Sequence, residues 1–177
     1  LILHALAQVR REMPNVLLVI AGEGNAKRSL QKLAAELELS DNIRFVGYLD
    51  RDSTLLDCYA SADLFVFSSS TETQGLVLLE AMAAGTPLVS VAAMGTVDIL
   101  KDCPAATATD GTPRDFAGKI LGLLRNRSHL QELKQQASEY VGRWDAETLA
   151  RCMVEYYEQI IAEYHPRSQR RHDRRRA

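Results

Sequence analysis

Apolar and polar residues follow two different rhythms along the chain. Short runs rich in Val, Ile, Leu and Phe predict strands at 16–21, 43–46, 64–67 and 88–91, and a less apolar run predicts a further short strand at 105–108. Between these runs, apolar residues recur every three or four positions, which predicts helices at 1–9, 25–39, 52–61, 76–84, 97–101, 113–124, 128–141 and 146–164. Strands that alternate with helices are typical of a parallel sheet. We therefore expect an α/β fold in which helices cover both faces of a parallel sheet.

Local signals sharpen the predictions for three of these elements. The strand Val16–Ala21 (VLLVIA) is almost entirely apolar, so both of its faces are expected to be buried. Asp52 or Ser53 is the expected cap of a helix, because a short polar side chain can accept a hydrogen bond from a free N–H group at the helix start. Gly85 is expected to end the helix Leu76–Ala84.

Composition places the chain among ordinary globular domains. It has 177 residues, of which 46% are hydrophobic and 25% are charged, and its three cysteines form no CxxC pair. These proportions exclude a disordered, collagen-like or membrane-spanning chain. An odd number of scattered cysteines argues against a disulfide framework and favours a reducing compartment. We therefore expect a cytoplasmic protein.

Charge is divided unevenly along the chain. Residues 165–177 hold six Arg and one Asp, whereas residues 1–164 hold 15 basic and 22 acidic residues. We expect residues 1–164 to form one domain and residues 165–177 to form a basic, disordered tail. The tail is either a solvated terminus or a contact for an anionic membrane surface, at about 1 kcal/mol per basic residue. The acidic domain argues against a nucleic-acid partner.

Three loops follow predicted strands, and ligands of open α/β sheets bind at this edge. The loops are residues 22–25, 47–50 and 68–75. The first contains Gly22 and Gly24 in a Gly-x-Gly turn that lacks the third glycine of a dinucleotide-binding motif. These two glycines either approach a ligand or only permit the turn from strand to helix.

The segment 68–90 (SSSTETQGLVLLEAMAAGTPLVS) carries the strongest chemical signal. At the start of its helix, the N–H groups of Gly75, Leu76 and Val77 form a site that suits an anion such as phosphate. Glu80 lies one turn further along on the same side, in an apolar stretch where an unpaired carboxylate would be costly to bury. It either accepts hydrogen bonds from the diol of a ribose or pairs with an arginine.

Glu72 precedes this helix, at the mouth of the same site. Its carboxylate is suited to bind sugar hydroxyl groups or to stabilise positive charge at a reacting carbon. The alternative is an ordinary exposed carboxylate or a local cap, and the pattern by itself favours this alternative.

The same segment resembles the C-terminal, donor-binding half of the retaining GT-B glycosyltransferases of family 4. These enzymes carry two glutamates with seven residues between them, the second in a helix followed by Ala-Met-Ala-x-Gly-x-Pro-Val. The matching residues here are Ser69, Glu72, Gly75, Glu80, Ala81, Met82, Ala83, Gly85 and Pro87. With flanking matches at 17–24, 43–49 and 59–67, the likeness covers about residues 1–162. The resemblance implies a Rossmann-like domain that forms one half of a GT-B fold.

The resemblance also implies a role for each residue of the site. Glu72 would be the catalytic residue that holds hydroxyl groups of the transferred sugar, and Glu80 would bind the ribose of a nucleotide sugar. The remaining donor-binding residues would be Gln74, Gly75, Leu76 and Val77 through their backbone, Val46, Gly47 and Tyr48 beside the base, and Gly22 and Gly24 in the first loop.

The partners implied by the resemblance are a UDP- or GDP-linked sugar and an acceptor-binding N-terminal domain. Neither a cofactor nor a metal ion would be needed, because helix N-termini and basic side chains neutralise the departing diphosphate in these enzymes. The arginine and lysine that bind the diphosphate in the family would precede Leu1, and so would the acceptor-binding domain. We therefore expect a fragment that is inactive by itself.

The acceptor is indicated only by Gln74, which stands where an aromatic residue is frequent in the family. The Thr-Gln-Gly variant is similar to enzymes that glycosylate membrane lipids, so we expect a membrane lipid or a polysaccharide precursor, met at the inner face of the membrane. Two other functions stay open. The domain is alternatively part of a GT-B sugar-nucleotide epimerase, or a non-catalytic nucleotide-binding or scaffolding module.

Overall fold

The computed structural model describes the backbone of residues 1–173 and the side chains of residues 1–164. The chain divides into two compact units, Leu1–Tyr140 and Val141–Ala177, and each is considered by itself. We expected residues 1–164 to form one domain, and that boundary stays a prediction.

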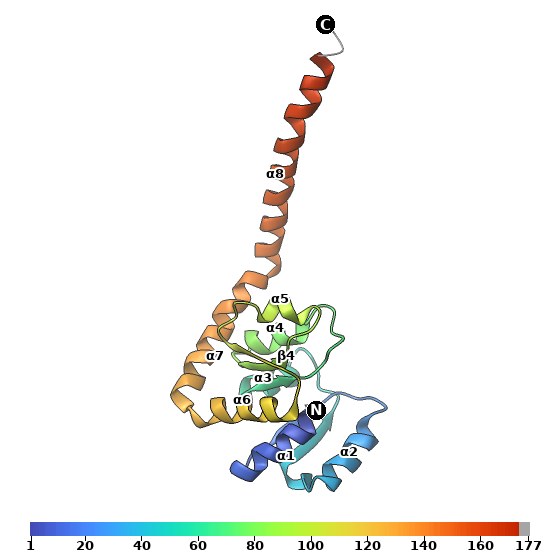
Figure 1. Ribbon diagram of the computed structural model, residues 1–177, viewed down its shortest axis with the longest axis vertical. Coiled ribbons are helices and arrows are strands. Elements are labelled where there is room, and N and C mark those ends of the chain that lie inside the picture. Colours follow the sequence, from blue (N-terminus) through green and yellow to red (C-terminus); the bar gives the residue numbers. More distant parts are fainter. Residues whose placement is uncertain (174–177) are drawn as a thin grey trace. The chain divides into compact units, whose positions relative to one another are not determined.

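Helices and strands alternate along the first unit (Figure 1). In chain order they are α1 (Ile2–Glu12), β1 (Leu18–Ala21), α2 (Lys27–Glu36), β2 (Ile43–Gly47), α3 (Thr54–Ser61), β3 (Phe65–Phe67), α4 (Leu76–Ala83), β4 (Leu88–Val91), α5 (Thr96–Leu100), β5 (Ala106–Thr109), α6 (Pro113–Arg125) and α7 (Arg127–Val141). Every predicted helix and strand of this unit is present, with ends that differ by a few residues.

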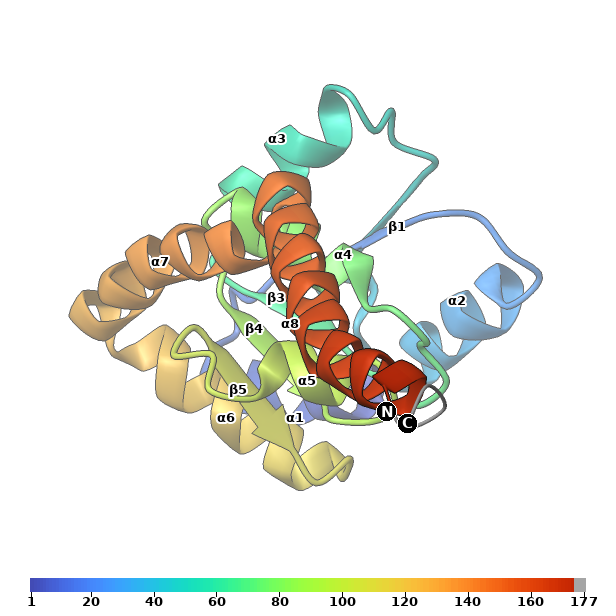
Figure 2. The ribbon, with the colours of Figure 1, turned by 90° about the horizontal axis from the view of Figure 1, so that it is seen from above.

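The strands pair in parallel throughout, which confirms the predicted α/β class. They form two sheets, however, where the sequence predicted one. Strands β1 and β2 pair with Leu18 opposite Ile43. Strands β3, β4 and β5 form the second sheet, in which β4 lies between its two neighbours (Figure 2).

The predicted burial of both faces of the first strand is wrong. Side chains of β1 are alternately half-buried and exposed: Leu18 and Ile20 point into the core, whereas Val19 is 42% exposed. Leu17, just before the strand, is 54% exposed. The reason is that β1 pairs with a strand on one edge only and packs against helices on one face. Strand β4, paired on both edges, buries three of its four residues completely or nearly so.

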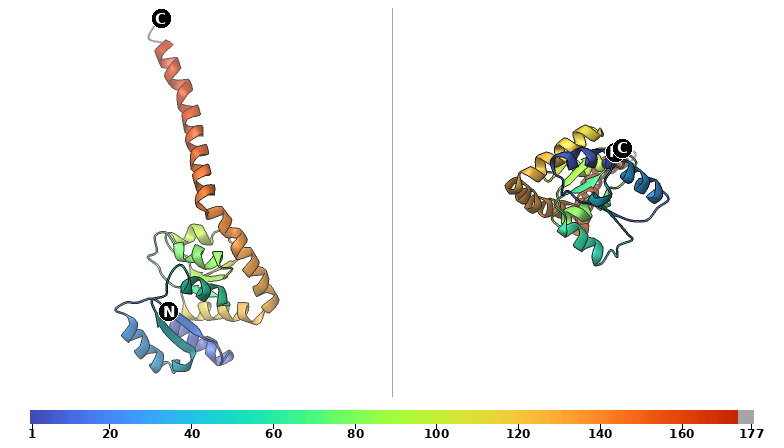
Figure 3. Two further views of the ribbon diagram at one scale, coloured as in Figure 1. Left: turned by 180° about the vertical axis from the view of Figure 1, so that it is seen from behind. Right: turned by 90° about the horizontal axis from the view of Figure 1, so that it is seen from below.

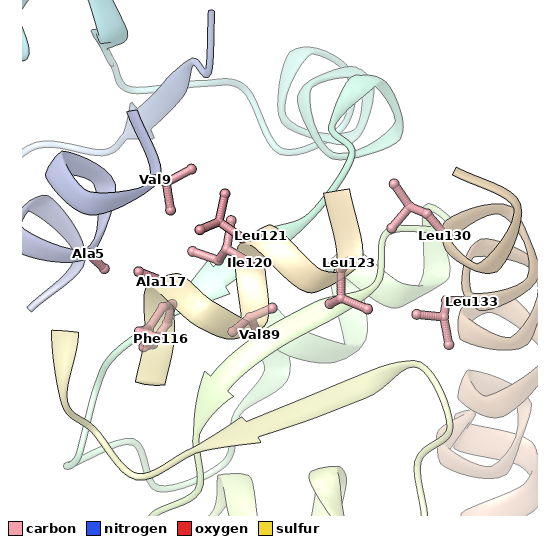
Figure 4. Packing of buried hydrophobic residues seen from close by; sticks show 10 residues of the cluster. All are labelled: Ala5, Val9, Val89, Phe116, Ala117, Ile120, Leu121, Leu123, Leu130 and Leu133. Carbon is pink, nitrogen blue, oxygen red and sulfur yellow. The ribbon is translucent and has the colours of Figure 1, made fainter. Parts of the chain in front are cut away.

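Two apolar clusters hold the first unit together, and helix α1 contributes to both. On one side Ala5 and Val9 pack against α6, β4 and α7; the buried members are Ala5, Val9, Val89, Phe116, Ala117, Ile120, Leu121, Leu123, Leu130 and Leu133 (Figure 4). On the other side Leu3 and Leu6 pack with α2 and with the β1–β2 sheet, beside which α1 and α2 lie (Figures 1 and 3). Apolar side chains at 3, 5, 6 and 9 thus let one helix cover two sheets.

The end of α4 agrees with its sequence prediction, whereas the predicted capping bond at the start of α3 is absent. Gly85 adopts φ +77°, its N–H donates to the carbonyl of Met82, and the N–H of Thr86 donates to that of Ala81. This paired pattern ends α4 as predicted. At α3, the side chain of Ser53 makes no cap bond and donates to Asp50 Oδ1 instead. Asp50 also accepts from the backbone N–H of Asp52, so it organises this turn in place of the predicted cap residues.

The second unit consists mainly of helix α8 (Ala146–Asp173). Asp145 accepts a hydrogen bond from the backbone N–H of Thr148 at its start, over 2.8 Å. The predicted end was Tyr164, and the helix continues past it. The apolar side chains at helical spacing that predict the helix 146–164 are all exposed: Leu149, Cys152, Met153, Tyr156, Tyr157 and Ile160. The side chains of the predicted basic tail, 165–177, lie outside the described residues. Among the helices of residues 1–173, none is long and apolar enough to cross a bilayer.

Candidate donor-binding site

The site predicted from the sequence lies where β3 ends and α4 begins. Gly75 is the residue before α4, and its φ of +70° falls in the left-handed region that glycine adopts without strain. This conformation turns the loop 68–75 sharply into the helix. The first turn of α4 therefore points its free N–H groups toward the carboxyl end of β3.

Glu72 folds back onto the loop that carries it. Its Oε1 atom accepts hydrogen bonds from the backbone N–H groups of Gln74, over 3.1 Å, and Gly75, over 3.0 Å. These donors favour the charged carboxylate, and the Gly75 bond foremost lowers the pKa of Glu72 below its ordinary value. In this geometry Glu72 is the local cap that was one of the two interpretations of the sequence.

Two backbone donors of the predicted anion site stay available. Among the described residues, the N–H groups of Leu76 and Val77 have no hydrogen-bond partner. Leu76 is 55% exposed and Gln74 is exposed, so the start of α4 is open to solvent. Free N–H groups at the positive end of a helix attract anions.

Glu80 is half-buried, and Arg51 forms an ion pair with it. Arg51 comes from the loop after β2, and its side chain is 67% exposed, whereas that of Glu80 is 29% exposed. The pair is thus a surface contact between a loop and helix α4 and not an internal neutralisation. Exposed pairs of this kind stabilise a protein by only about 0–1 kcal/mol, so hydroxyl groups of a ligand can replace Arg51 at little cost.

Tyr59 of α3 lies in the field of this pair. Burial raises the pKa of its hydroxyl, and the negative charge of Glu80 adds to the rise. The backbone carbonyl of Tyr59 accepts a 2.6 Å hydrogen bond from the buried hydroxyl of Thr86, just past the end of α4. This bond fastens α3 to α4 and so fixes the helix that carries Glu80.

The glycine loops of β1 and β2 meet at the carboxyl end of their sheet. The N–H of Gly22 donates to the carbonyl of Gly47 over 2.7 Å, and both residues have positive φ angles, +111° and +72°. Gly24, in contrast, has open space around it and an ordinary φ. Val46 and Tyr48 flank this junction and are 44% and 70% exposed. Their surface is available to a planar ligand group.

Sequence reasoning missed two residues of this site. Arg51 lies at the predicted ligand edge of the sheet, and that position was a signal that could have singled it out. Gly95, in the connector between β4 and α5, donates its N–H to the carbonyl of Glu72 over 3.0 Å. No spacing rule links Gly95 to Glu72, because this contact depends on how two loops meet in space.

The described residues offer no group of three His, Cys, Asp or Glu side chains that could hold a metal ion. A separate open hollow of about 350 Å³ lies at the start of α6, lined by Asp110, Thr112, Arg114, Asp115, Gly118 and Lys119. Two of its four charged side chains pair with each other, Lys119 with Asp115 over 2.9 Å. None of the residues predicted for the donor-binding site lines this hollow.

The matched family is described as glycosyl transferases group 1, and the match covers residues 1–140. The chain is 32% identical to the lipopolysaccharide core biosynthesis glycosyltransferase LpsE of Rhizobium meliloti, over 90% of this chain and 45% of LpsE. It is 33% identical to the alpha-monoglucosyldiacylglycerol synthase of Streptococcus pneumoniae, over 88% of this chain and 34% of the synthase. The chain thus spans less than half the length of both relatives.

Solved glycosyltransferase structures share the fold. S. aureus TarM, solved as a variant in complex with fondaparinux, alpha-GlcNAc-glycerol and UDP, matches 86% of this chain and 31% of TarM with a TM-score of 0.74 and 25% identity. Anabaena HepE, solved with UDP and glucose, matches 89% of this chain and 44% of HepE with a TM-score of 0.76 and 22% identity. The chain belongs to the glycosyl transferases group 1 family.

Proposed function

We propose that residues 1–164 form the donor-binding domain of a glycosyltransferase of family 4 that transfers a sugar from a UDP- or GDP-linked donor with retention of anomeric configuration. The observation that carries the proposal is the arrangement of two glutamates around the start of α4, Glu72 in the loop before the helix and Glu80 in its second turn. Between them in the chain lie the N–H groups of Leu76 and Val77, which have no partner among the described residues.

Each residue of the site then has a task. The diphosphate binds at the N–H groups of Leu76 and Val77, and the ribose diol replaces Arg51 at Glu80. A diol can donate two hydrogen bonds to one carboxylate, and such charge-assisted bonds are stronger than neutral ones. The base lies beside the exposed side chains of Val46 and Tyr48, near the junction of Gly22 and Gly47, with Gly24 in the same loop as Gly22.

Glu72 is the proposed catalytic residue. Its carboxylate already accepts two backbone N–H bonds, from Gln74 and Gly75, and therefore stays charged. A fixed carboxylate at the mouth of the site can accept hydrogen bonds from sugar hydroxyl groups and stabilise positive charge at the anomeric carbon in the transition state. Metal-independent neutralisation of the diphosphate by backbone N–H groups and basic side chains completes the proposal.

The acceptor side is proposed to lie outside this chain, on an acceptor-binding domain of the GT-B type, since the relatives are more than twice as long. One relative is named an alpha-monoglucosyldiacylglycerol synthase and another a lipopolysaccharide core biosynthesis glycosyltransferase. Both names support a lipid or polysaccharide-precursor acceptor. We propose that the enzyme acts in the cytoplasm at the inner face of the membrane, with the basic segment 165–177 as a peripheral contact. Without the domain that binds the acceptor, we expect no turnover.

The test is a calorimetric titration of the chain with UDP and with GDP. We expect one of the two to bind and Glu80→Gln to weaken that binding. A matched control is Glu36→Gln in α2. Glu36 is also a helical glutamate in an ion pair, with Lys32, so this variant removes the same charge away from the site. If neither nucleotide binds, or if both variants bind as the original chain does, the proposal is wrong.

A further inference from the structure

The connector between β4 and α5, residues 92–95, lies against the loop that carries Glu72. The backbone N–H of Gly95 donates to the carbonyl of Glu72 over 3.0 Å. A Cβ atom at Gly95 would lie 2.0 Å from the carbonyl oxygen of Thr73 and 2.9 Å from the backbone nitrogen of Gln74. Both are backbone atoms, so no side-chain rotation can relieve the contact. Only glycine allows these two loops to approach so closely.

Thr96 holds the connector from the other side. It is completely buried, and its hydroxyl accepts a 2.9 Å hydrogen bond from the N–H of Ala93. The same hydroxyl lies 2.8 Å from the carbonyl of Ala93 and 3.2 Å from that of Val91. Met94, which follows Ala93, adopts φ +48°. Residues other than glycine keep this conformation only where surrounding contacts enforce it. Thr96 supplies those contacts.

Helix α5 also shapes the other end of the Glu72 turn. A Cβ atom at Gly75 would lie 2.8 Å from Cδ1 of Ile99 and 3.6 Å from Cγ2 of Thr96. The N–H of Gly75 is one of the two donors that hold the Glu72 carboxylate. The connector and α5 therefore touch the turn at its start, through Glu72, and at its end, through Gly75.

We propose that Gly95 and Thr96 are positioning residues that fix the orientation of the Glu72 carboxylate. Neither contacts that carboxylate, and both act through the backbone of residues 72–75. The purpose of this orientation, the binding of the transferred sugar, rests on the proposed function. The orientation itself can be measured without any nucleotide.

The test compares Gly95→Ala with Gly118→Ala, a control in α6 where an added Cβ meets nothing within 4 Å. The pKa of Glu72 is measured by NMR of its labelled carboxyl carbon, and hydrogen exchange is measured at the amides of Gln74 and Gly75. We expect Gly95→Ala to raise the pKa of Glu72 toward its ordinary value and to speed exchange roughly tenfold or more. If Gly95→Ala folds and both readouts match those of the control, the inference is overturned.

A second pair of variants covers the case in which Gly95→Ala does not fold. Thr96→Val removes the hydroxyl at nearly constant volume, whereas Thr96→Ser keeps it. We expect the valine variant to shift the same two readouts and the serine variant to restore them. Equal readouts in the valine variant and the original chain overturn the inference. A merely structural role would lower the free energy of unfolding without moving the pKa of Glu72, and that result also overturns it.

A titration with UDP and GDP separates this inference from the proposed function. If the original chain binds neither nucleotide, the proposed function fails, and the NMR readouts still decide whether Gly95 and Thr96 position Glu72. If a nucleotide binds but the readouts of Gly95→Ala and Thr96→Val stay unchanged, the positioning inference alone fails.

Discussion

The loop before α4 and the helix itself hold their glutamates by opposite means. Glu72 is fixed by donors within its own turn, the backbone N–H groups of Gln74 and Gly75. Glu80 is held by Arg51, which belongs to another loop and lies 29 positions away in the chain. Local hydrogen bonds form wherever the turn forms, but the ion pair exists only when the β2 and β3 regions are assembled.

This difference fits the two roles proposed for these carboxylates. Backbone donors are rigid and cannot leave, so Glu72 keeps its charge and orientation whether or not a ligand is present. A long arginine side chain at the surface is mobile and weakly held, so Glu80 can exchange its partner for a ligand. The first arrangement suits a residue that must act on a reacting centre, and the second suits a residue that must recognise a ligand.

The largest effect is expected from Gly75→Ala, because Gly75 joins the two regions. An alanine there would carry a left-handed φ and place its Cβ 2.8 Å from Ile99. Strain of the backbone and overpacking together are expected to lower the free energy of unfolding by about 3 kcal/mol. Urea denaturation measures this value. A loss no greater than that of an ordinary surface substitution, about 0.5 kcal/mol, would show that the turn relaxes freely.

Glu80→Gln is expected to have the next largest effect, on ligand affinity rather than on stability. Loss of charge-assisted hydrogen bonds to the ribose should weaken nucleotide binding by about 1–3 kcal/mol, or roughly 5- to 150-fold. Calorimetry with the nucleotide that binds the original chain measures the change. Glu72→Gln is the internal comparison and should leave nucleotide affinity closer to that of the original chain. Equal losses in both variants would erase the proposed division of roles.

Low pH should remove a stabilising contribution of the Glu72 carboxylate that the Glu72→Gln variant lacks at every pH. The pKa of Glu72 is lowered in the folded state, so the charged carboxylate contributes stability above the ordinary carboxyl pKa. That contribution is lost as the pH falls through the lowered folded value. We expect the stability difference between the original chain and Glu72→Gln to shrink from about pH 5 downward. Denaturation curves at several pH values test this, and a constant difference would contradict it.

The smallest effect is expected from Arg51→Gln. The pair with Glu80 is exposed on the arginine side, so its loss should change the free energy of unfolding by less than about 1 kcal/mol. High salt should remove most of that difference. A comparison of urea midpoints at low and high salt measures it. A large, salt-independent loss would mean that Arg51 is a structural residue and that Glu80 is not free to change partners.

Much of the fold could be predicted because its signals are local. The five strand segments and the helices between them follow from runs and periods of apolar residues, and Gly85 ends α4 through a bond pattern that involves only its neighbours. Ser53 is the residue before α3, one of the two predicted cap positions, but its side chain makes no cap bond. Its hydroxyl donates to Asp50 Oδ1 instead, and helix-start rules do not include this competing partner three positions earlier.

The α/β class, the order of the elements and the positions of the two glutamates around the start of α4 follow from the amino-acid pattern alone, because each depends on residues a few positions apart. The exposure of Val19, the contact of Arg51 with Glu80 and the approach of Gly95 to Thr73 arise only in the folded chain. These three facts depend on which strand edges are paired and on which loops meet at their ends. Neither can be read from spacing, because pairing partners are chosen by the packing of the whole unit.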